Sequence, residues 1–112
     1  MRKDDVIRLR HMLDAAQEAC AFAVGRARED LNSDRQLTLA LVKAIEIIGE
    51  AASRVSMETR QAYLNLPWQE SVSMRNRLIH GYYSINLDIV WSTVRYELPP
   101  LIGELQRILE PE

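Results

Sequence analysis

The sequence predicts an all-α protein, an up-and-down bundle of four to five helices, and three observations point to this class. Apolar residues recur at steps of three and four over most of the chain, which is the period of an amphipathic helix. Glycine, proline and capping residues fall between these segments, where helices end and begin. The 112 residues are enough for one domain with one core. We therefore expect a single helical domain over residues 1–112, without strands.

The first helix is predicted over residues 4 to 24. Asp4 and Asp5 suit the positive end of its dipole. His11 falls off the apolar stripe, so we interpret it as a solvated surface histidine. The stripe itself consists of Val6, Leu9, Leu13, Ala16, Cys20 and Ala23.

The second helix is predicted to begin at Asn32 or Ser33, with Ser33-x-x-Gln36 as a capping box, and to run to about Val55. Apolar residues occupy most of its sides, which is typical of a central helix or of one that faces a partner chain. Gly49 lies inside it, and we expect this glycine to permit the close approach of another helix.

Glu46 and Glu50 lie four residues apart on one face of this second helix. Two carboxylates bind a divalent metal well only when further ligands join them. We therefore prefer a solvated edge or a salt bridge to a nearby arginine, and we predict neither a metal nor a cofactor.

Proline and glycine mark the limits of the later helices. Pro67 stands near the start of the third helix, which we expect to end near Gly81. Asn86 or Ser84 caps the fourth helix. The prolines at 99–100 remove helix hydrogen bonds, so a kink or break is predicted there, before an amphipathic helix to the C-terminus.

Composition and charge narrow the function. No apolar run reaches the ~18 residues of a membrane span, no signal-peptide core follows the charged start, and Cys20 is the only cysteine. We therefore expect a cytoplasmic protein in which this cysteine is a small buried apolar residue. The net charge of −2 argues against a general nucleic-acid binder but leaves room for a local basic cleft.

One polar stretch, residues 73–82, interrupts the apolar pattern of the third helix. On a wheel at ~100° per residue, Arg75 and Tyr82 share one stripe, and Asn76 and His80 share the next. A guanidinium keeps its charge, so beside apolar neighbours it needs anions or acceptors. Arg75 near His80 therefore indicates an anion site next to a proton-transfer group.

These residue types suit RNA cleavage by the RNA's own 2′-hydroxyl. Arg75 would stabilise the charge on phosphorus, His80 would transfer a proton, and Asn76 would orient His80 or bind the scissile phosphate. One histidine cannot stand on both sides of the phosphorus, and His11 is remote in sequence. A twofold homodimer would resolve this, because an isologous interface pairs each patch with itself.

The spacing Arg75-x4-His80-x-Tyr82 resembles the motif of the HepT-like toxins, within the HEPN superfamily of helical nucleases. The resemblance covers residues 4 to 110 and implies a HEPN-like bundle. Further segments follow in the family's order: residues 44–52, 66–68, 74–80, 88–91 and 97–99.

The resemblance implies a metal-independent endoribonuclease toxin that acts as a homodimer, with a composite site that leaves a cyclic phosphate end. Arg75 and His80 are then catalytic, Asn76 assists them, and Glu50 supports them because the family pattern places an acid there. The resemblance also implies a minimal nucleotidyltransferase (MNT) antitoxin that silences the toxin by transferring AMP onto Tyr82. Gly81 stands where many relatives have an acid.

Two alternatives stay open at this point. In the first, the Arg75 cleft binds phosphate without cleaving it, in a nucleotide- or substrate-binding subunit of a two-component nucleotidyltransferase. In the second, Arg75 bridges to Glu46 or Glu50 in a buried salt-bridge network, and the protein is a purely structural dimeric bundle.

Overall fold

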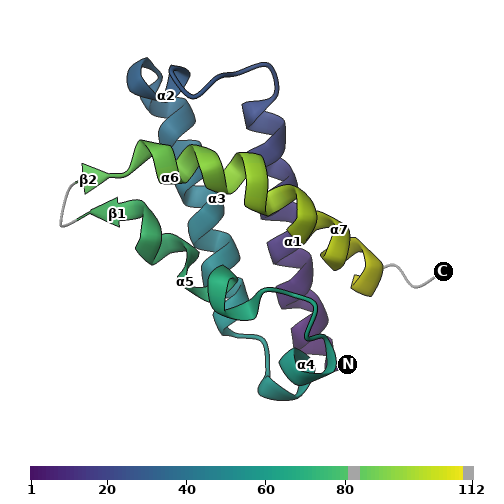
Figure 1. The fold of residues 1–112 in the computed structure, drawn as a ribbon. Helices are drawn as coiled ribbons and strands as arrows, with labels where there is room; N and C mark the ends of the chain where they lie inside the picture. Colours follow the sequence, from purple (N-terminus) through teal and green to yellow (C-terminus); the bar gives the residue numbers. More distant parts are fainter. Residues whose placement is uncertain (81–83, 110–112) are drawn as a thin grey trace.

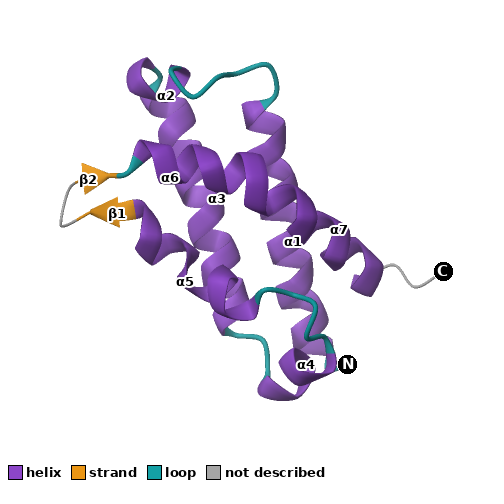
Figure 2. Ribbon diagram, in the orientation of Figure 1, coloured by secondary structure: helices purple, strands orange, loops and turns teal. Residues whose placement is uncertain are grey.

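Helices make up most of the molecule within residues 1–80 and 84–109, which the computed structural model describes (Figure 1, Figure 2). A short strand pairing accompanies them. In chain order the elements are α1 (Lys3–Ala23), α2 (Asp30–Ser33), α3 (Arg35–Ser53), α4 (Met57–Ala62), α5 (Trp68–Leu78), β1 (Ile79–His80), β2 (Ser84–Ile85), α6 (Leu87–Ser92), the π-helix η1 (Thr93–Glu97) and α7 (Leu98–Leu109).

Helix α3 lies at the centre of the bundle. It packs against α1 and α5, and α1 also packs against α7. The helical rod formed by α6, η1 and α7 crosses both α3 and α1 (Figure 1). The predicted all-α bundle, with its second long helix in a central position, is confirmed.

The core consists of the apolar stripes that predicted these helices. Cys20 packs at its edge, half-buried rather than fully buried, and burial raises the pKa of its thiol. None of the described helices is both long and apolar enough to cross a membrane. The largest fully buried apolar side chains are Leu9, Met12, Leu41, Ile45, Ile48, Met74, Leu78, Val90, Leu98, Leu101 and Leu105.

Helix α3 begins later than predicted, because Asp34 rather than Asn32 or Ser33 is its N-cap. The Asp34 Oδ1 accepts the Leu37 N–H at 3.0 Å, and Arg26 donates to Oδ2 at 2.7 Å. The Arg26 guanidinium and the Leu37 N–H together hold the pKa of Asp34 below its ordinary value. A carboxylate with two such donors caps the helix better than a neutral side chain without them.

Gly49 permits a close approach of α3 to α5, as predicted. A Cβ placed on this buried glycine would lie 3.3 Å from the carbonyl oxygens of both Ser71 and Val72. The separation of the two helices is therefore set at a position within one turn of Glu46 on α3 and Arg75 on α5, the residues that meet across the helix pair.

Helix α5 ends at Leu78, earlier than the predicted end near Gly81. The backbone then enters an antiparallel pairing in which His80 lies opposite Ser84. The Asn86 N–H donates to the Leu78 carbonyl at 2.6 Å, so a later segment satisfies a carbonyl left free at the helix end. The prediction of a bundle without strands is therefore wrong at this one place, where two residues of β1 pair with two residues of β2.

The rod of α6, η1 and α7 passes the two prolines of α7 without a break. Asn86 caps α6, the first element of this rod, as predicted, because its side chain accepts the Ile89 N–H at 3.1 Å. Before the prolines, the Leu98 N–H donates to the carbonyl of Thr93, five residues back, in a wider π-helical turn. The prolines at 99–100 then occupy the first turn of α7, where a missing N–H disturbs the helix least.

Asp5 links α1 to the start of α4. Its carboxylate is buried, with the residue only 2% exposed. Oδ2 accepts from the hydroxyls of Ser56 and Thr59, each at 2.6 Å, and Oδ1 accepts the Ser56 N–H at 3.0 Å. Burial raises the pKa of Asp5, but these hydrogen bonds outweigh that effect and leave the pKa lowered. Asp5 therefore ties two helices together, a role beyond the predicted dipole interaction.

Candidate functional site

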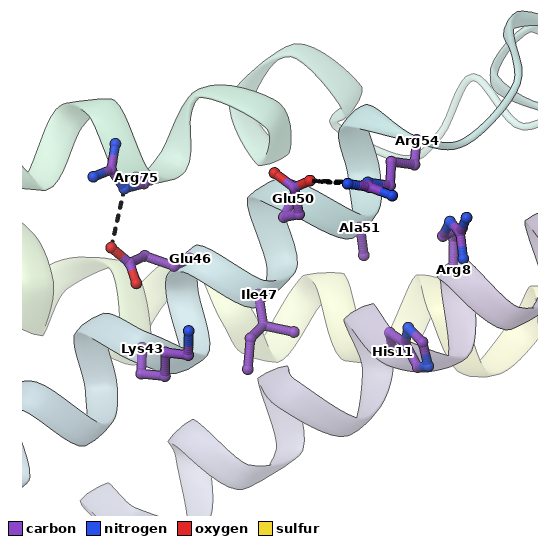
Figure 3. Close-up of a pocket in the computed structure, with 9 residues that line it drawn as sticks. All are labelled: Arg8, His11, Lys43, Glu46, Ile47, Glu50, Ala51, Arg54 and Arg75. Carbon is purple, nitrogen blue, oxygen red and sulfur yellow. Dashed lines mark hydrogen bonds and ion pairs between the residues drawn. The ribbon is translucent and has the colours of Figure 1, made fainter.

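Arg75 lies on α5 and faces Glu46 of α3 (Figure 3). Its Nε–H donates to Glu46 Oε2 at 3.0 Å, and the two side chains are 54% and 30% exposed. Arg75 therefore meets an acceptor, as a guanidinium beside apolar neighbours requires, and it is exposed because α5 turns Ser71 and Met74 inward. The same exposure does not fit the alternative of a buried salt-bridge network.

The contact with Glu46 leaves most of the Arg75 guanidinium free. A guanidinium has five N–H donors, and the ion pair uses the one on Nε. In Figure 3 the two terminal nitrogens lie on the side away from Glu46. The carboxylate thus orients the group, while its outer edge remains open to an anion that accepts two parallel hydrogen bonds, such as a phosphate. An ion pair this exposed contributes only about 0.2–1 kcal/mol to stability.

A groove of about 510 Å³ runs beside Arg75 (Figure 3). Its positions on α3 follow steps of three and four, so they share one face of that helix. Four full positive charges and two negative ones line it, in a chain whose net charge is −2. A local basic cleft therefore exists. The residues that line it are Arg8, His11, Lys43, Glu46, Ile47, Glu50, Ala51, Arg54 and Arg75.

Glu50 lies in the same groove but pairs with Arg54, at 2.8 Å, rather than with Arg75. Each carboxylate of the predicted pair on α3 thus binds an arginine, as we preferred over a metal site. Within residues 1–80 and 84–109, no cluster of three or more His, Cys, Asp or Glu side chains is placed to hold a metal ion. The supporting role of Glu50 stays a prediction.

The other predicted site residues follow Arg75 along the chain. Asn76 is exposed on α5. The backbone of His80 belongs to β1, five residues beyond Arg75, but its side chain lies outside the described part of the structure. Tyr82 and the neighbouring Gly81 also lie outside the described residues. The structure therefore places Arg75 and Glu50 on one groove, and the roles of Asn76, His80 and Tyr82 stay predictions.

Sequence reasoning missed Arg8 and His11 as neighbours of this groove. His11 is exposed, as predicted, but α1 packs along α3 and places it on the groove wall (Figure 3). Arg8 and His11 are three residues apart, which puts them on one face of α1. That spacing is visible in the sequence, whereas the pairing of this face with α3 is not.

Comparison with known proteins identifies the family. The "Ribonuclease HepT-like" family matches residues 12–108. The chain is 36% identical to "Putative RNase TTE0752" of Caldanaerobacter subterraneus subsp. tengcongensis, over 92% of this chain and 96% of that protein. It is 32% identical to "Probable ribonuclease HepT" of Thermococcus cleftensis, over 71% and 73% of the two chains.

A third relative is longer than this chain. The chain is 34% identical to "Gamma-glutamylcyclotransferase and putative RNase MJ0434" of Methanocaldococcus jannaschii, over 98% of this chain and 50% of that protein. No solved structure matches the chain at a significant level.

Proposed function

The chain belongs to the HepT-like ribonuclease family, and from this we propose that it is a metal-independent endoribonuclease toxin whose catalytic residues are Arg75 and His80. The observation that carries the proposal is the state of Arg75. This side chain is half-exposed, is held at Nε by Glu46, and presents its outer edge beside a groove with an excess of positive charge. These properties support a phosphate-binding role for Arg75.

In the proposed reaction, the 2′-oxygen of a ribose attacks the neighbouring phosphorus while a base removes its proton. The bond from phosphorus to the 5′-oxygen breaks, and an acid protonates that leaving oxygen. The products are a 2′,3′-cyclic phosphate and a 5′-hydroxyl. Arg75 stabilises the charge that develops on the phosphoryl oxygens, and His80 transfers a proton. Asn76, the next residue on α5, orients His80 or binds the phosphate.

A homodimer completes this site. The base and the acid act on opposite sides of the phosphorus, so one imidazole cannot be at both places. An isologous dimer brings a second copy of Arg75 and His80 to the same cleft. The position of Arg75 on an open surface supports this arrangement, because a second chain has access to it.

Regulation through Tyr82 belongs to the same proposal. A minimal nucleotidyltransferase antitoxin transfers AMP from ATP: the Tyr82 oxygen loses its proton and bonds to the α-phosphorus, the bond to the β-phosphate breaks, and pyrophosphate leaves. The added phosphate then occupies the Arg75 site and blocks RNA. Incubation with the cognate antitoxin and ATP should add the mass of one AMP group to the wild type and to Tyr83→Phe, but not to Tyr82→Phe. Modification of Tyr82→Phe with loss of modification in Tyr83→Phe would assign the acceptor to the neighbouring tyrosine instead.

The central test is cleavage of RNA by the purified protein. Arg75→Ala and His80→Ala should each lower the cleavage rate by about 10²-fold or more, the range measured when a placed charge or proton-transfer group is removed. Arg107→Ala is the control, because Arg107 is 72% exposed on α7 and does not line the groove.

Equal cleavage by the wild type and His80→Ala would contradict the catalytic role of His80, and no cleavage by the wild type would contradict the nuclease proposal. Nucleotide binding that depends on Arg75, with no cleavage by any variant, would favour the alternative of a non-catalytic subunit of a two-component nucleotidyltransferase. The open edge of Arg75 beside the basic groove is the observation that keeps this second function in view.

A further inference from the structure

Two cations of the groove have no carboxylate partner in the described part of the chain. Lys43 forms no ion pair with a described carboxylate, and the buried Nε of Arg8 has no hydrogen-bond partner there. The other two cations are different, because Arg75 is held by Glu46 and Arg54 by Glu50. The excess positive charge of the groove therefore belongs to Arg8 and Lys43.

An N–H of a guanidinium that is neither hydrated nor bonded carries a free-energy cost of about 1–3 kcal/mol, and more for a charged group. An anion that accepts hydrogen bonds from the other guanidinium nitrogens of Arg8 would offset this cost without reaching the buried Nε. The Arg8 side chain is half-buried on the groove wall, so that anion would approach through the groove.

The dimensions of the groove suit an extended anion. Lys43 lies on α3 and Arg54 is the C-cap residue of that helix, eleven residues later, which corresponds to about 16 Å along the helix axis. Successive phosphates of one strand advance by about 3.4 Å in a duplex and by a longer step in an extended single strand, so this length accommodates more than one phosphate. Among the residues that line the groove in Figure 3, Arg75 lies at one end, and Arg8 and His11 of α1 lie at the other.

We propose that this groove binds the sugar–phosphate backbone of the RNA strand beside the scissile phosphate, with Arg8 and Lys43 as its phosphate contacts. This inference rests on the proposed nuclease function, because it places the scissile phosphate at Arg75 and leads the strand away along α1 and α3. Contacts to phosphates carry no base sequence, so the groove binds single-stranded RNA of any sequence. His11 lines the same path as a further polar contact.

The test measures binding without cleavage. A fluorescent oligoribonucleotide with 2′-O-methyl groups has no nucleophile for self-cleavage, and its anisotropy reports the Kd at several salt concentrations. Lys43→Gln and Arg8→Gln should each weaken binding roughly tenfold, the effect of one charge-assisted contact. Each should also make the slope of log K against log salt shallower by about 0.7. Oligo(U) and oligo(A) should be affected equally.

Arg107→Gln is the matched control, since it removes the same charge from α7, outside the groove. Thermal unfolding shows whether each variant folds, and Lys43 is exposed, so Lys43→Gln decides the matter even if Arg8→Gln does not fold. Binding by Lys43→Gln that equals binding by Arg107→Gln would overturn the inference. So would a change of oligomeric state without a change in RNA binding, because the groove would then be a protein interface.

The outcomes separate this inference from the proposed function. If the wild type binds the oligonucleotide through Arg8 and Lys43 but cleaves no unmodified RNA, the groove stands and the nuclease proposal fails. If the wild type cleaves RNA and the groove variants bind as the control does, the nuclease proposal stands and the groove inference fails.

Discussion

At the scale of single residues, the buried and hydrogen-bonded carboxylate of Asp5 should contribute measurably to the stability of the fold. We expect Asp5→Ala to lower the free energy of unfolding by about 3 kcal/mol, because the hydroxyls of Ser56 and Thr59 lose a charged acceptor inside the protein. Chemical denaturation at neutral pH measures the change. Asp4→Ala is the control: Asp4 is exposed in the same first turn, so its loss should stay within about 0.5 kcal/mol. Equal effects of both substitutions would contradict this assignment.

The lowered pKa of Asp5 also fixes the sign of a pH dependence. The folded state binds a proton at Asp5 more weakly than the unfolded state does. The carboxylate therefore stabilises the fold at pH values above its ordinary pKa of about 4. That contribution is lost as the pH falls from there toward the folded-state pKa. The difference in unfolding free energy between the wild type and Asp5→Ala should therefore narrow below about pH 4.

Arg75 illustrates what a local pattern does and does not predict for a single residue. The residue type, its spacing to His80 and the family motif all identify it from the sequence. Its exposure could not be predicted, because the apolar neighbours on a wheel do not say which of them another helix covers. Its partner Glu46 lies on a helix 29 residues away in sequence, and only the packing of α5 on α3 selects Glu46 over Glu50.

At the scale of helices, two glycines should respond to alanine in opposite directions. Gly49→Ala should destabilise by about 1 kcal/mol, because its Cβ would meet the backbone of α5 at 3.3 Å and the strain exceeds the gain in helix propensity. Gly103→Ala on α7 has no atom within 4 Å of the new Cβ and should stabilise by about 1 kcal/mol. Thermal or chemical unfolding measures both.

Stabilisation by both substitutions would show that α5 can move away from the new Cβ without a loss of stability. The close approach of α3 to α5 would then not constrain the site. If Gly49→Ala does strain this contact, α5 must shift. The ion pair between Arg75 and Glu46 then becomes longer, and RNA cleavage should fall more than it does in Gly103→Ala.

Helix ends show where sequence reasoning fails at this scale. The period of three and four located the long helices, because burial of one stripe is enough to define them. Their limits depend on distant partners: Arg26 favours Asp34 as the cap of α3, and Asn86 binds the carbonyl at the end of α5. The groove likewise depends on contacts between segments that are distant in sequence, because Arg8 and His11 line it only when α1 packs on α3.

For the whole molecule, the distribution of charge matters more than the total. The chain carries a net charge of −2, yet the lining of its groove carries two more positive than negative charges. The proposed attraction of RNA by this groove would act only at short range, because salt screens charges more than ~8–10 Å apart. The expectation that the chain is no general nucleic-acid binder stays a prediction, and the net charge could not locate the cleft.

At the scale of the whole molecule, the proposed chemistry depends on the proposed homodimer. Wild-type chains mixed with an equal amount of His80→Ala chains, and refolded together so that partners exchange, should retain about one quarter of the wild-type activity. Random pairing leaves about one dimer in four with two intact histidines, and a composite site needs both. Independent sites would retain about one half.

Mixing with Arg107→Gln chains is the control and should leave the activity unchanged, because that arginine is on α7 away from the groove. Cleavage per unit of total protein, measured over a series of mixing ratios, distinguishes the two cases by the shape of the curve. A quadratic dependence on the wild-type fraction follows when two copies of His80 act on one phosphate. A straight line means that each chain cleaves alone, and the second proton-transfer group would then have to come from within the same chain.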